Sequence, residues 1–146
     1  MQDLEIAKNR LSTKKLTLSI VKNAETLFES NAHGISGLLE AIEKLEEKLE
    51  GASVADRVVG KAIALLCVYA GVKAVYALIL SEKAKEIFEN YNVHHEWKIF
   101  VEKILDVNKR ETCPFEKLAI NIFNPQEAYE KFKTLQKTMK CRGKNE

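Results

Sequence analysis

The residues best suited to chemistry lie in one run, Gly51-Ala52-Ser53-Val54-Ala55-Asp56-Arg57-Val58-Val59-Gly60-Lys61. It precedes the most apolar stretch of the chain, and we interpret the two together as one helix from Ser53 to Ala70. Ser53 is a suitable N-cap, and Asp56 completes a capping-box-like pair. On a helix, Arg57 and Lys61 would share a face, where they repel each other and oppose the macrodipole. Charges placed against local preference indicate a functional site.

The same residues predict an anion pocket at the N-terminus of this helix. Ser53, Arg57, Gly60 and Lys61 would bind the ligand, because helix amides and two cations attract negative charge and glycine allows close approach. Asp56 would be a cap, an ion-pair partner or a general acid/base. In the alternative interpretation, both cations reach solvent or pair with the acidic segment Glu40 to Glu50, and Gly60 lets another helix pack close.

Cys113 is a second candidate, because Pro114 favours the first position of a helix. Cys113 would then be the N-cap, where the positive helix end favours a thiolate nucleophile or ligand. The alternative is a capping or half-buried thiol without chemistry. We interpret Cys67 as a core residue and Cys141 as incidental. The three cysteines form no C-x-x-C pair, so neither a disulfide scaffold nor a zinc knuckle is expected.

One triplet, His94-His95-Glu96, matches the H-x-E pattern of zinc deaminases. That pattern requires a helix N-terminus and a downstream P-C-x-x-C, whereas this triplet lies in a predicted strand and has no such partner. We therefore expect no metal and no cofactor. The P-loop, G-x-G-x-x-G, G-x-S-x-G and H-E-x-x-H motifs are also missing from the sequence.

The composition, 46% hydrophobic and 30% charged over 146 residues, is that of one globular domain spanning residues 1–146. We expect its basic tail, residues 138–146, to fray. The net charge of +2 disfavours nucleic acid as a partner, and a homo-oligomer stays open. The longest apolar stretch, Ala62 to Ala70, falls short of the roughly 20 residues that a bilayer needs. With no signal peptide recognised, we expect no membrane contact and a cytoplasmic location.

The hydrophobic pattern predicts an α/β protein in which an antiparallel hairpin joins a parallel portion. The expected elements are a helix at Asp3 to Leu11, strands at Leu16 to Val21 and Glu25 to Ser30 with a tight turn at Asn23-Ala24, and a helix at Ile35 to Leu49. After the Ser53 to Ala70 helix come a buried strand at Val72 to Leu80, a helix from Ser81 to Tyr91, a strand at Val93 to Trp97 and a helix at Lys98 to Leu105. A polar loop at Asp106 to Thr112, a short helix at Pro114 and a final helix from Pro125 to about Lys137 complete the chain.

Several segments together resemble the prokaryotic family called domain of unknown function 1893. They are Leu18-Ser19-Ile20-Val21-Lys22, Phe28-Glu29-Ser30, the run Gly51 to Lys61 with Ala62 to Tyr69, Ala70-Gly71-Val72-Lys73-Ala74-Val75-Tyr76, and Cys113-Pro114-Phe115-Glu116-Lys117. The resemblance covers about Thr17 to Phe132. It implies a cytidine-deaminase-like fold, a three-layer α/β/α sandwich around a mixed sheet.

The resemblance also implies where the zinc site of an active deaminase would lie. There, H-x-E begins the helix after the first hairpin, and P-C-x-x-C begins the helix after the third strand. On our interpretation Ala55-Asp56-Arg57 and Ser81-Glu82-Lys83-Ala84 stand at these places, so the zinc ligands and the catalytic glutamate are missing. The segment Ile35 to Glu50 would be an insertion, acting as a lid or an oligomer face.

We therefore expect the protein to bind a small anionic molecule, nucleotide-like or phosphorylated, with Asp56, Lys61 and Cys113 as the residues available for non-zinc chemistry. The alternative is a catalytically inert interaction module that uses the Ile35 to Leu49 helix or the Cys113 loop as its contact surface. A nucleic-acid binder is a third hypothesis, which the balanced charge disfavours.

Overall fold

A five-stranded mixed sheet forms the centre of the molecule in the computed structural model, which describes residues 2–32, 34–104 and 114–144. The strands are β1 (Leu18–Lys22), β2 (Glu25–Ser30), β3 (Ser53–Val59), β4 (Ala74–Ser81) and β5 (His94–Val101). Their order is β2-β1-β3-β4-β5, with β1 antiparallel to both β2 and β3. The strands β3, β4 and β5 run parallel, which confirms the expected mixed sheet with an N-terminal hairpin.

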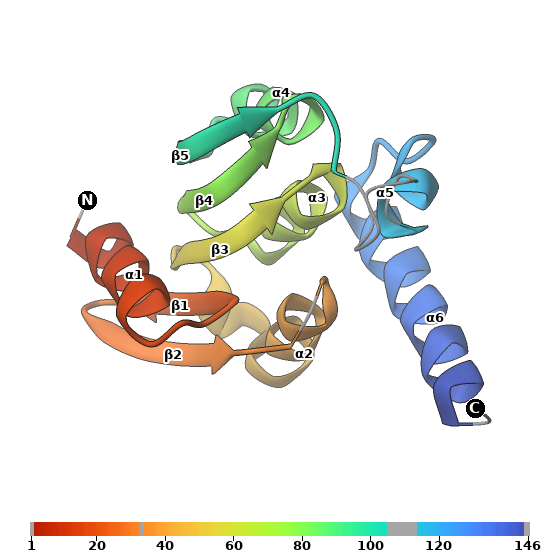
Figure 1. Cartoon of the computed structure of the whole chain (residues 1–146), viewed down its shortest axis with the longest axis horizontal. Helices are drawn as coiled ribbons and strands as arrows, with labels where there is room; N and C mark the ends of the chain where they lie inside the picture. The colour runs from red at the N-terminus through yellow and green to blue at the C-terminus, as the bar shows by residue number, and fades with distance from the viewer. Residues whose placement is uncertain (1, 33, 105–113, 145–146) are drawn as a thin grey trace.

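Helices cover both faces of this sheet, so the three-layer sandwich is confirmed (Figure 1). The helices are α1 (Gln2–Thr13), α2 (Ser36–Leu45) with the 3-10 helix η1 (Glu46–Leu49), α3 (Lys61–Ala70), α4 (Glu82–Asn90), α5 (Pro114–Ala119) and α6 (Pro125–Lys144). Helix α1 packs on β1 and β3 from one side. Helices α2, α3 and α4 cover the other side, and α5 and α6 pack against α3.

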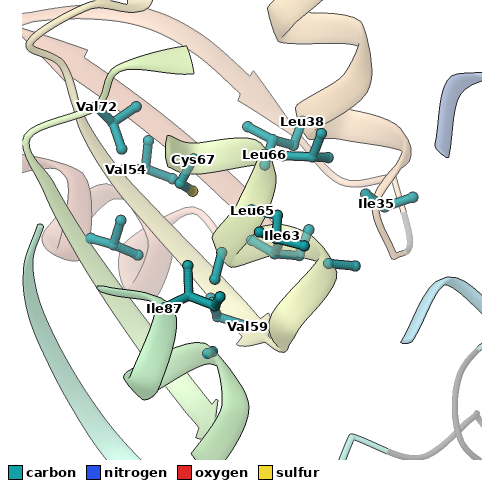
Figure 2. Packing of buried hydrophobic residues seen from close by; sticks show 14 of the residues in the cluster. Ile35, Leu38, Val54, Val59, Ile63, Leu65, Leu66, Cys67, Val72 and Ile87 are labelled. Carbon is teal, nitrogen blue, oxygen red and sulfur yellow. The ribbon is translucent and has the colours of Figure 1, made fainter. Parts of the chain in front are cut away.

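The two faces of the sheet carry separate hydrophobic cores. The larger core joins the sheet to α2 through α6, and Figure 2 shows side chains such as Leu38, Val54 and Leu66 converging within it. The smaller core lies under α1 and includes Leu4 and Tyr76. Both faces of β3 and β4 are therefore buried over most of their length, as expected for the inner strands of a covered parallel sheet.

The β1–β2 turn has the left-handed backbone that a tight hairpin needs. Asn23 and Ala24 have φ values of 52° and 66°, although alanine disfavours this region. The Asp3 carboxylate compensates by accepting hydrogen bonds from the backbone N–H groups of Asn23 (3.0 Å) and Ala24 (2.9 Å). Helix α1 thus helps to hold the turn.

The predicted helix from Ser53 to Ala70 is wrong in its first half. Residues Ser53–Val59 form β3, Gly60 is the N-cap, and the helix begins only at Lys61. Ser53 and Asp56 are therefore not a capping pair. A strand buried on both faces shows no polar alternation, and the spacing of Ser53 and Asp56 imitates a capping box, so the local pattern was misleading.

The helix predicted at Lys98 to Leu105 is also wrong where the structure describes it, because β5 continues to Val101 in register with β4. The other described elements match their expected types. In particular, Ser81 is the N-cap of α4, and its Oγ accepts a hydrogen bond from the Ala84 N–H at 3.1 Å. Helix α6 extends past the expected end, to Lys144.

The end of α3 offers a test of the fold. Gly71 has a φ of 76°, and its N–H closes the helix on the carbonyl groups of Cys67 and Val68. We expect Gly71→Ala to lower the free energy of unfolding by about 1 kcal/mol, because a Cβ disfavours this backbone conformation. Gly71→Asn should cost less, since asparagine tolerates the left-handed region. Urea denaturation measures both, and equal losses for the two variants would contradict this explanation.

Candidate functional site

The structure separates the charged residues that the sequence placed on one helix face. In β3, Asp56 pairs with Leu18 of β1 and Ala77 of β4, which both belong to the larger core, so its side chain faces α2 and α3. Arg57 is the next residue in the strand and points to the opposite face, toward α1. Lys61 lies beyond the end of the strand, in the first turn of α3.

The N-terminus of α3 is capped by a distant carboxylate. Glu116, from α5, accepts hydrogen bonds from the backbone N–H groups of Lys61 at 3.0 Å and Ala62 at 2.8 Å. A negative charge is favourable there, because these amides have no partner within the helix and the macrodipole is positive. Burial raises the pKa of Glu116, and the two amide hydrogen bonds oppose that rise. The anion expected at this end of the run is thus supplied by the chain itself.

Gly60 makes this contact sterically feasible. A Cβ at Gly60 would lie 2.3 Å from Oε1 and 2.5 Å from Cδ of Glu116. As in the alternative interpretation of Gly60, the glycine lets a residue of another helix, Glu116 of α5, approach closely. Gly60 is the N-cap of α3 and does not lie inside a helix, as the predicted helix from Ser53 to Ala70 would have placed it.

Lys61 is a buried cation without a carboxylate partner. Its side chain is 7% exposed, and its Nζ donates to the Ile120 carbonyl at 3.3 Å and lies 4.3 Å from the centre of the Phe123 ring. Within the described part of the chain it forms no ion pair, and Glu116 is engaged by the backbone instead. Burial lowers the pKa of Lys61 and the nearby Lys83 ammonium lowers it further, while the negative charges of Glu116 and Glu86 partly oppose this fall.

Lys61 lines a cavity of about 520 Å³ at the carboxyl ends of the parallel strands. Ser81 and Lys83 come from the β4–α4 junction, and Glu116 closes the α5 side. An apolar wall contains Ile120 and Phe123, which are 59% and 73% exposed. Glu82, Glu102, Lys103 and Ile104 complete the lining. The cavity thus combines a buried cation, mixed surface charges and an exposed aromatic ring.

Asp56 is a buried carboxyl outside this cavity. It is 7% exposed, and its Oδ1 accepts a 3.3 Å hydrogen bond from the Val58 N–H. Burial raises its pKa to about 7, although the backbone amides of Val58 and Arg57 partly oppose the rise. The structure does not bring Asp56 to the cavity that contains Lys61. Ser53 is fully buried, and its Oγ has no hydrogen-bond partner.

Arg57 faces a different cavity, beneath α1. Its Nε donates to the Leu16 carbonyl, and its side chain lines a cavity of about 520 Å³ with residues of α1, β4 and β5. Neither Arg57 nor Lys61 pairs with the acidic Glu40 to Glu50 segment. The predicted ligand set of Ser53, Arg57, Gly60 and Lys61 is therefore not one site.

Cys113, the other candidate, lies outside the described residues. The segment that contains it instead contributes Glu116, which sequence reasoning did not select. In the sequence, Glu116 is a glutamate in the first turn after Pro114, which is typical of an ordinary helix-stabilising residue. Nothing local indicated that its partner would be another helix, 55 residues earlier in the chain.

Across residues 2–32, 34–104 and 114–144, no three His, Cys, Asp or Glu side chains group in a way that could hold a metal ion. Over the same ranges, no helix has the length and hydrophobicity needed to cross a bilayer. The H-x-E-like triplet, His94-His95-Glu96, lies in β5 as the sequence predicted.

Comparison with known proteins assigns the family. The profile of the domain of unknown function DUF1893, TM1506, matches residues 6–136. The chain belongs to the DUF1893 family. A solved DUF1893 family protein, TM1506 from Thermotoga maritima, is 25% identical with a TM-score of 0.84, over 91% of this chain and 89% of that one. Among curated proteins, no match was found.

More distant structures share the deaminase-like architecture. Acinetobacter baumannii RibD matches 67% of this DUF1893 chain and 35% of its own, at 19% identity and a TM-score of 0.50. The apo dCMP deaminase of cyanophage S-TIM5 matches 66% of this chain and 94% of its own, at 17% identity and a TM-score of 0.47. The observed mixed sheet with helices on both faces and the match to RibD agree with the expected fold class, and this chain spans only about a third of RibD.

The observed elements correct our assignment of the deaminase positions. The helix after the first hairpin is α2, which begins at Ser36, and the helix after the third strand is α3, which begins at Lys61. Ala55-Asp56-Arg57 lies within β3 and does not start a helix. The Ile35 to Glu50 segment is consequently the first of these two helices and its 3-10 extension, not an insertion.

The contact between Gly60 and Glu116 gives a testable coupling. Gly60→Ala should displace the Glu116 carboxylate and cost about 1–2 kcal/mol, the usual effect of losing a helix cap. Glu116→Ala should cost a similar amount. Because both variants break one interaction, the double variant should be no less stable than either single variant. Additive losses in urea denaturation would contradict this coupling.

The raised pKa of Asp56, about 7, gives a pH dependence. The protonated form stabilises the fold below the unfolded-state pKa of about 4, and this contribution is lost as the pH rises through about 7. Asp56→Asn should remove the dependence and be more stable than wild type at pH 8, by roughly 3–4 kcal/mol at most.

Chemical denaturation between about pH 5 and pH 8 measures this effect. Glu43→Gln, on the exposed face of α2, is the matched control and should retain the wild-type profile. An unchanged slope in Asp56→Asn would show that other groups determine the pH dependence.

Proposed function

We propose that this DUF1893 protein binds a small organic anion with a flat, partly apolar body in the cavity beside Lys61. The observation that carries the proposal is Lys61, a buried residue whose ammonium forms no ion pair within the described residues. A buried charge is costly without a close partner of opposite sign, and a bound anion would supply one. Binding sites commonly accept such a local cost in stability for the sake of function.

The place of the cavity in the fold supports the same function. Ligands of open α/β sheets bind outside the carboxyl ends of the parallel strands, and this cavity lies at the ends of β3, β4 and β5. The first turn of α4 adds backbone N–H groups on the same side. Ser81 Oγ accepts from the Ala84 N–H, so the N–H groups of Glu82 and Lys83, which have no partner within the helix, are the donors that could bind an anion.

The lining determines which anion fits. Lys61, Lys83 and Lys103 can attract its charged group, while Glu82 and Glu102 can accept hydrogen bonds from amino or hydroxyl groups. The exposed Phe123 ring and Ile120 offer an apolar surface for a planar body. A nucleotide or another phosphorylated heterocycle has a charged group, hydrogen-bond donors and a planar body. The cavity volume of about 520 Å³ is in the usual range for ligands of this size.

The predicted site residues have different roles in this cavity. Lys61 is the anchor, and Gly60 acts indirectly by admitting Glu116 to the start of α3. Arg57 lies on the other face of the sheet, and Asp56 does not line the cavity. The alternative is an inert module that uses the Ile35 to Leu49 helix or the Cys113 loop as its contact surface. The apolar side chains of that helix are buried in the core, so only its charged face remains for contacts, and Cys113 lies outside the described residues.

The test is a thermal-shift titration with adenosine monophosphate, comparing wild type with Lys61→Met. Methionine keeps the apolar stem and removes only the charge. We expect the wild type to gain about 2.7 kcal/mol at a ligand concentration near 100 times Kd, and the variant to lose the shift. Without ligand, Lys61→Met should be at least as stable as wild type, because an unpaired buried cation is removed.

Lys44→Met is the matched control, because Lys44 is exposed and pairs with Glu40 on α2. It should respond to adenosine monophosphate like wild type. An unchanged ligand response in Lys61→Met would reject the anchor role. A strongly destabilised Lys61→Met, together with a wild type that no nucleotide or sugar phosphate stabilises, would assign Lys61 a structural role instead.

A further inference from the structure

We infer that the cavity beneath α1 is a second, independent binding site for a small organic phosphate. It lies on the opposite face of the sheet from Lys61. Helix α1 packs over β1 and β3 and only borders β4 (Figure 1). A cavity of about 520 Å³ is lined by residues of α1, β3, β4 and β5. Its size is in the usual range for small-molecule sites, about 300–1,000 Å³.

The charge of this cavity is of one sign. Lys8 of α1, Arg57 of β3 and Lys98 of β5 line it, and its lining contains no carboxylate. Within the described residues none of the three cations forms an ion pair, whereas Arg10, two residues after Lys8, pairs with Glu29. Glu96 of β5 is hydrogen bonded to His94 at 2.7 Å. Three converging cations that lack acidic partners favour an anion of more than one charge.

The side chains are positioned for phosphate. The Arg57 Nε donates to the Leu16 carbonyl, which fixes the guanidinium while its terminal nitrogens keep their donors for a ligand. A planar guanidinium matches phosphate oxygens in a bidentate manner. The Lys8 Nζ lies 4.9 Å from the centre of the Tyr76 ring, at the edge of the same hollow. Asn9 and Ser12 add neutral hydrogen-bonding groups from α1.

An apolar surface beside these cations indicates an organic phosphate. Tyr76 and Leu78 of β4 line the cavity, and the body of the ligand would pack on them. The hollow is closed on one side by α1, and the net charge of the chain is only +2, so a small molecule fits better than a long polyanion.

The experiment is an amide NMR titration of the full chain with adenosine monophosphate and, separately, with inorganic phosphate. Chemical-shift changes show where the ligand binds. The amides of Ser12, Leu78 and Lys98 report on the cavity beneath α1, and those of Ala62 and Lys83 report on the cavity beside Lys61. We expect saturable shifts at the first group, and they should persist in Lys61→Met. Failure of the Lys61 site therefore leaves this result intact.

Charge-removing variants identify the ligand contacts. Arg57→Gln should weaken binding at this site by about tenfold or more, and Arg57→Lys by less, because the bidentate contact is lost but the charge remains. Lys98→Gln, at an exposed position without a described ion pair, should also weaken binding and keeps the test valid if Arg57→Gln fails to fold. Lys73→Gln is the control, since Lys73 pairs with Asp3 and lies outside the cavity.

Four results would overturn the proposal. The first is the lack of saturable shifts at Ser12, Leu78 and Lys98 up to about 10 mM ligand, a concentration that would reveal even millimolar affinity. The second is equal weakening by Lys73→Gln, which would indicate a general charge effect. The third is equal affinity for inorganic phosphate and adenosine monophosphate, which would show that Tyr76 and Leu78 do not contribute to binding. The fourth is much tighter binding of a single-stranded oligonucleotide, which would assign the surface to nucleic acid.

Discussion

The bond between the Glu116 carboxylate and the first amides of α3 organises one end of the molecule. It joins segments more than 50 residues apart and holds α5 against the helix that follows the central strand. Because a glycine precedes the helix, the carboxylate reaches Lys61 N and Ala62 N without a steric obstacle. Because its oxygens are committed to the backbone, the neighbouring Lys61 ammonium has no carboxylate partner of its own. One internal cap thus closes the helix end and leaves beside it a buried ammonium that forms no ion pair within the described residues.

The sheet imposes the second constraint. Consecutive side chains of a strand point to opposite faces, so Asp56 and Arg57 are in different environments although they are covalent neighbours. Asp56 enters the large core, where burial raises its pKa to about 7, and Arg57 lines the cavity under α1. Lys61 does not follow this alternation, because it is the first residue of α3. The three charged residues, which are close in sequence, therefore lie in three places: Asp56 in the large core, Arg57 on the α1 face of the sheet and Lys61 beyond the end of β3.

The likeness to deaminase structures is a likeness of fold, and fold alone does not specify chemistry. The start of the helix after the third strand, where the family resemblance implies P-C-x-x-C in active deaminases, here has Gly60, Lys61 and the bound Glu116 carboxylate. A glutamate from α5 thus occupies a position that the architecture makes favourable for negative charge. The cations of this family member are distributed to both sides of the sheet, so each face can be tested separately by removing one of them.

The sequence by itself determined the elements that depend on nearby residues. The hairpin at Asn23-Ala24, the Ser81 cap of α4 and the apolar run of β4 follow from turn chemistry, capping and a continuous hydrophobic stretch. With the family resemblance, these sufficed for the fold class. Tertiary structure alone decided that Ser53–Val59 is a strand, because its hydrogen bonds go to β1 and β4 and its burial on both faces conceals the strand period. It also decided the site, because the partners of Gly60, Arg57 and Lys61 come from α5, α1 and the strand ends, and no local pattern encodes contacts between such distant segments.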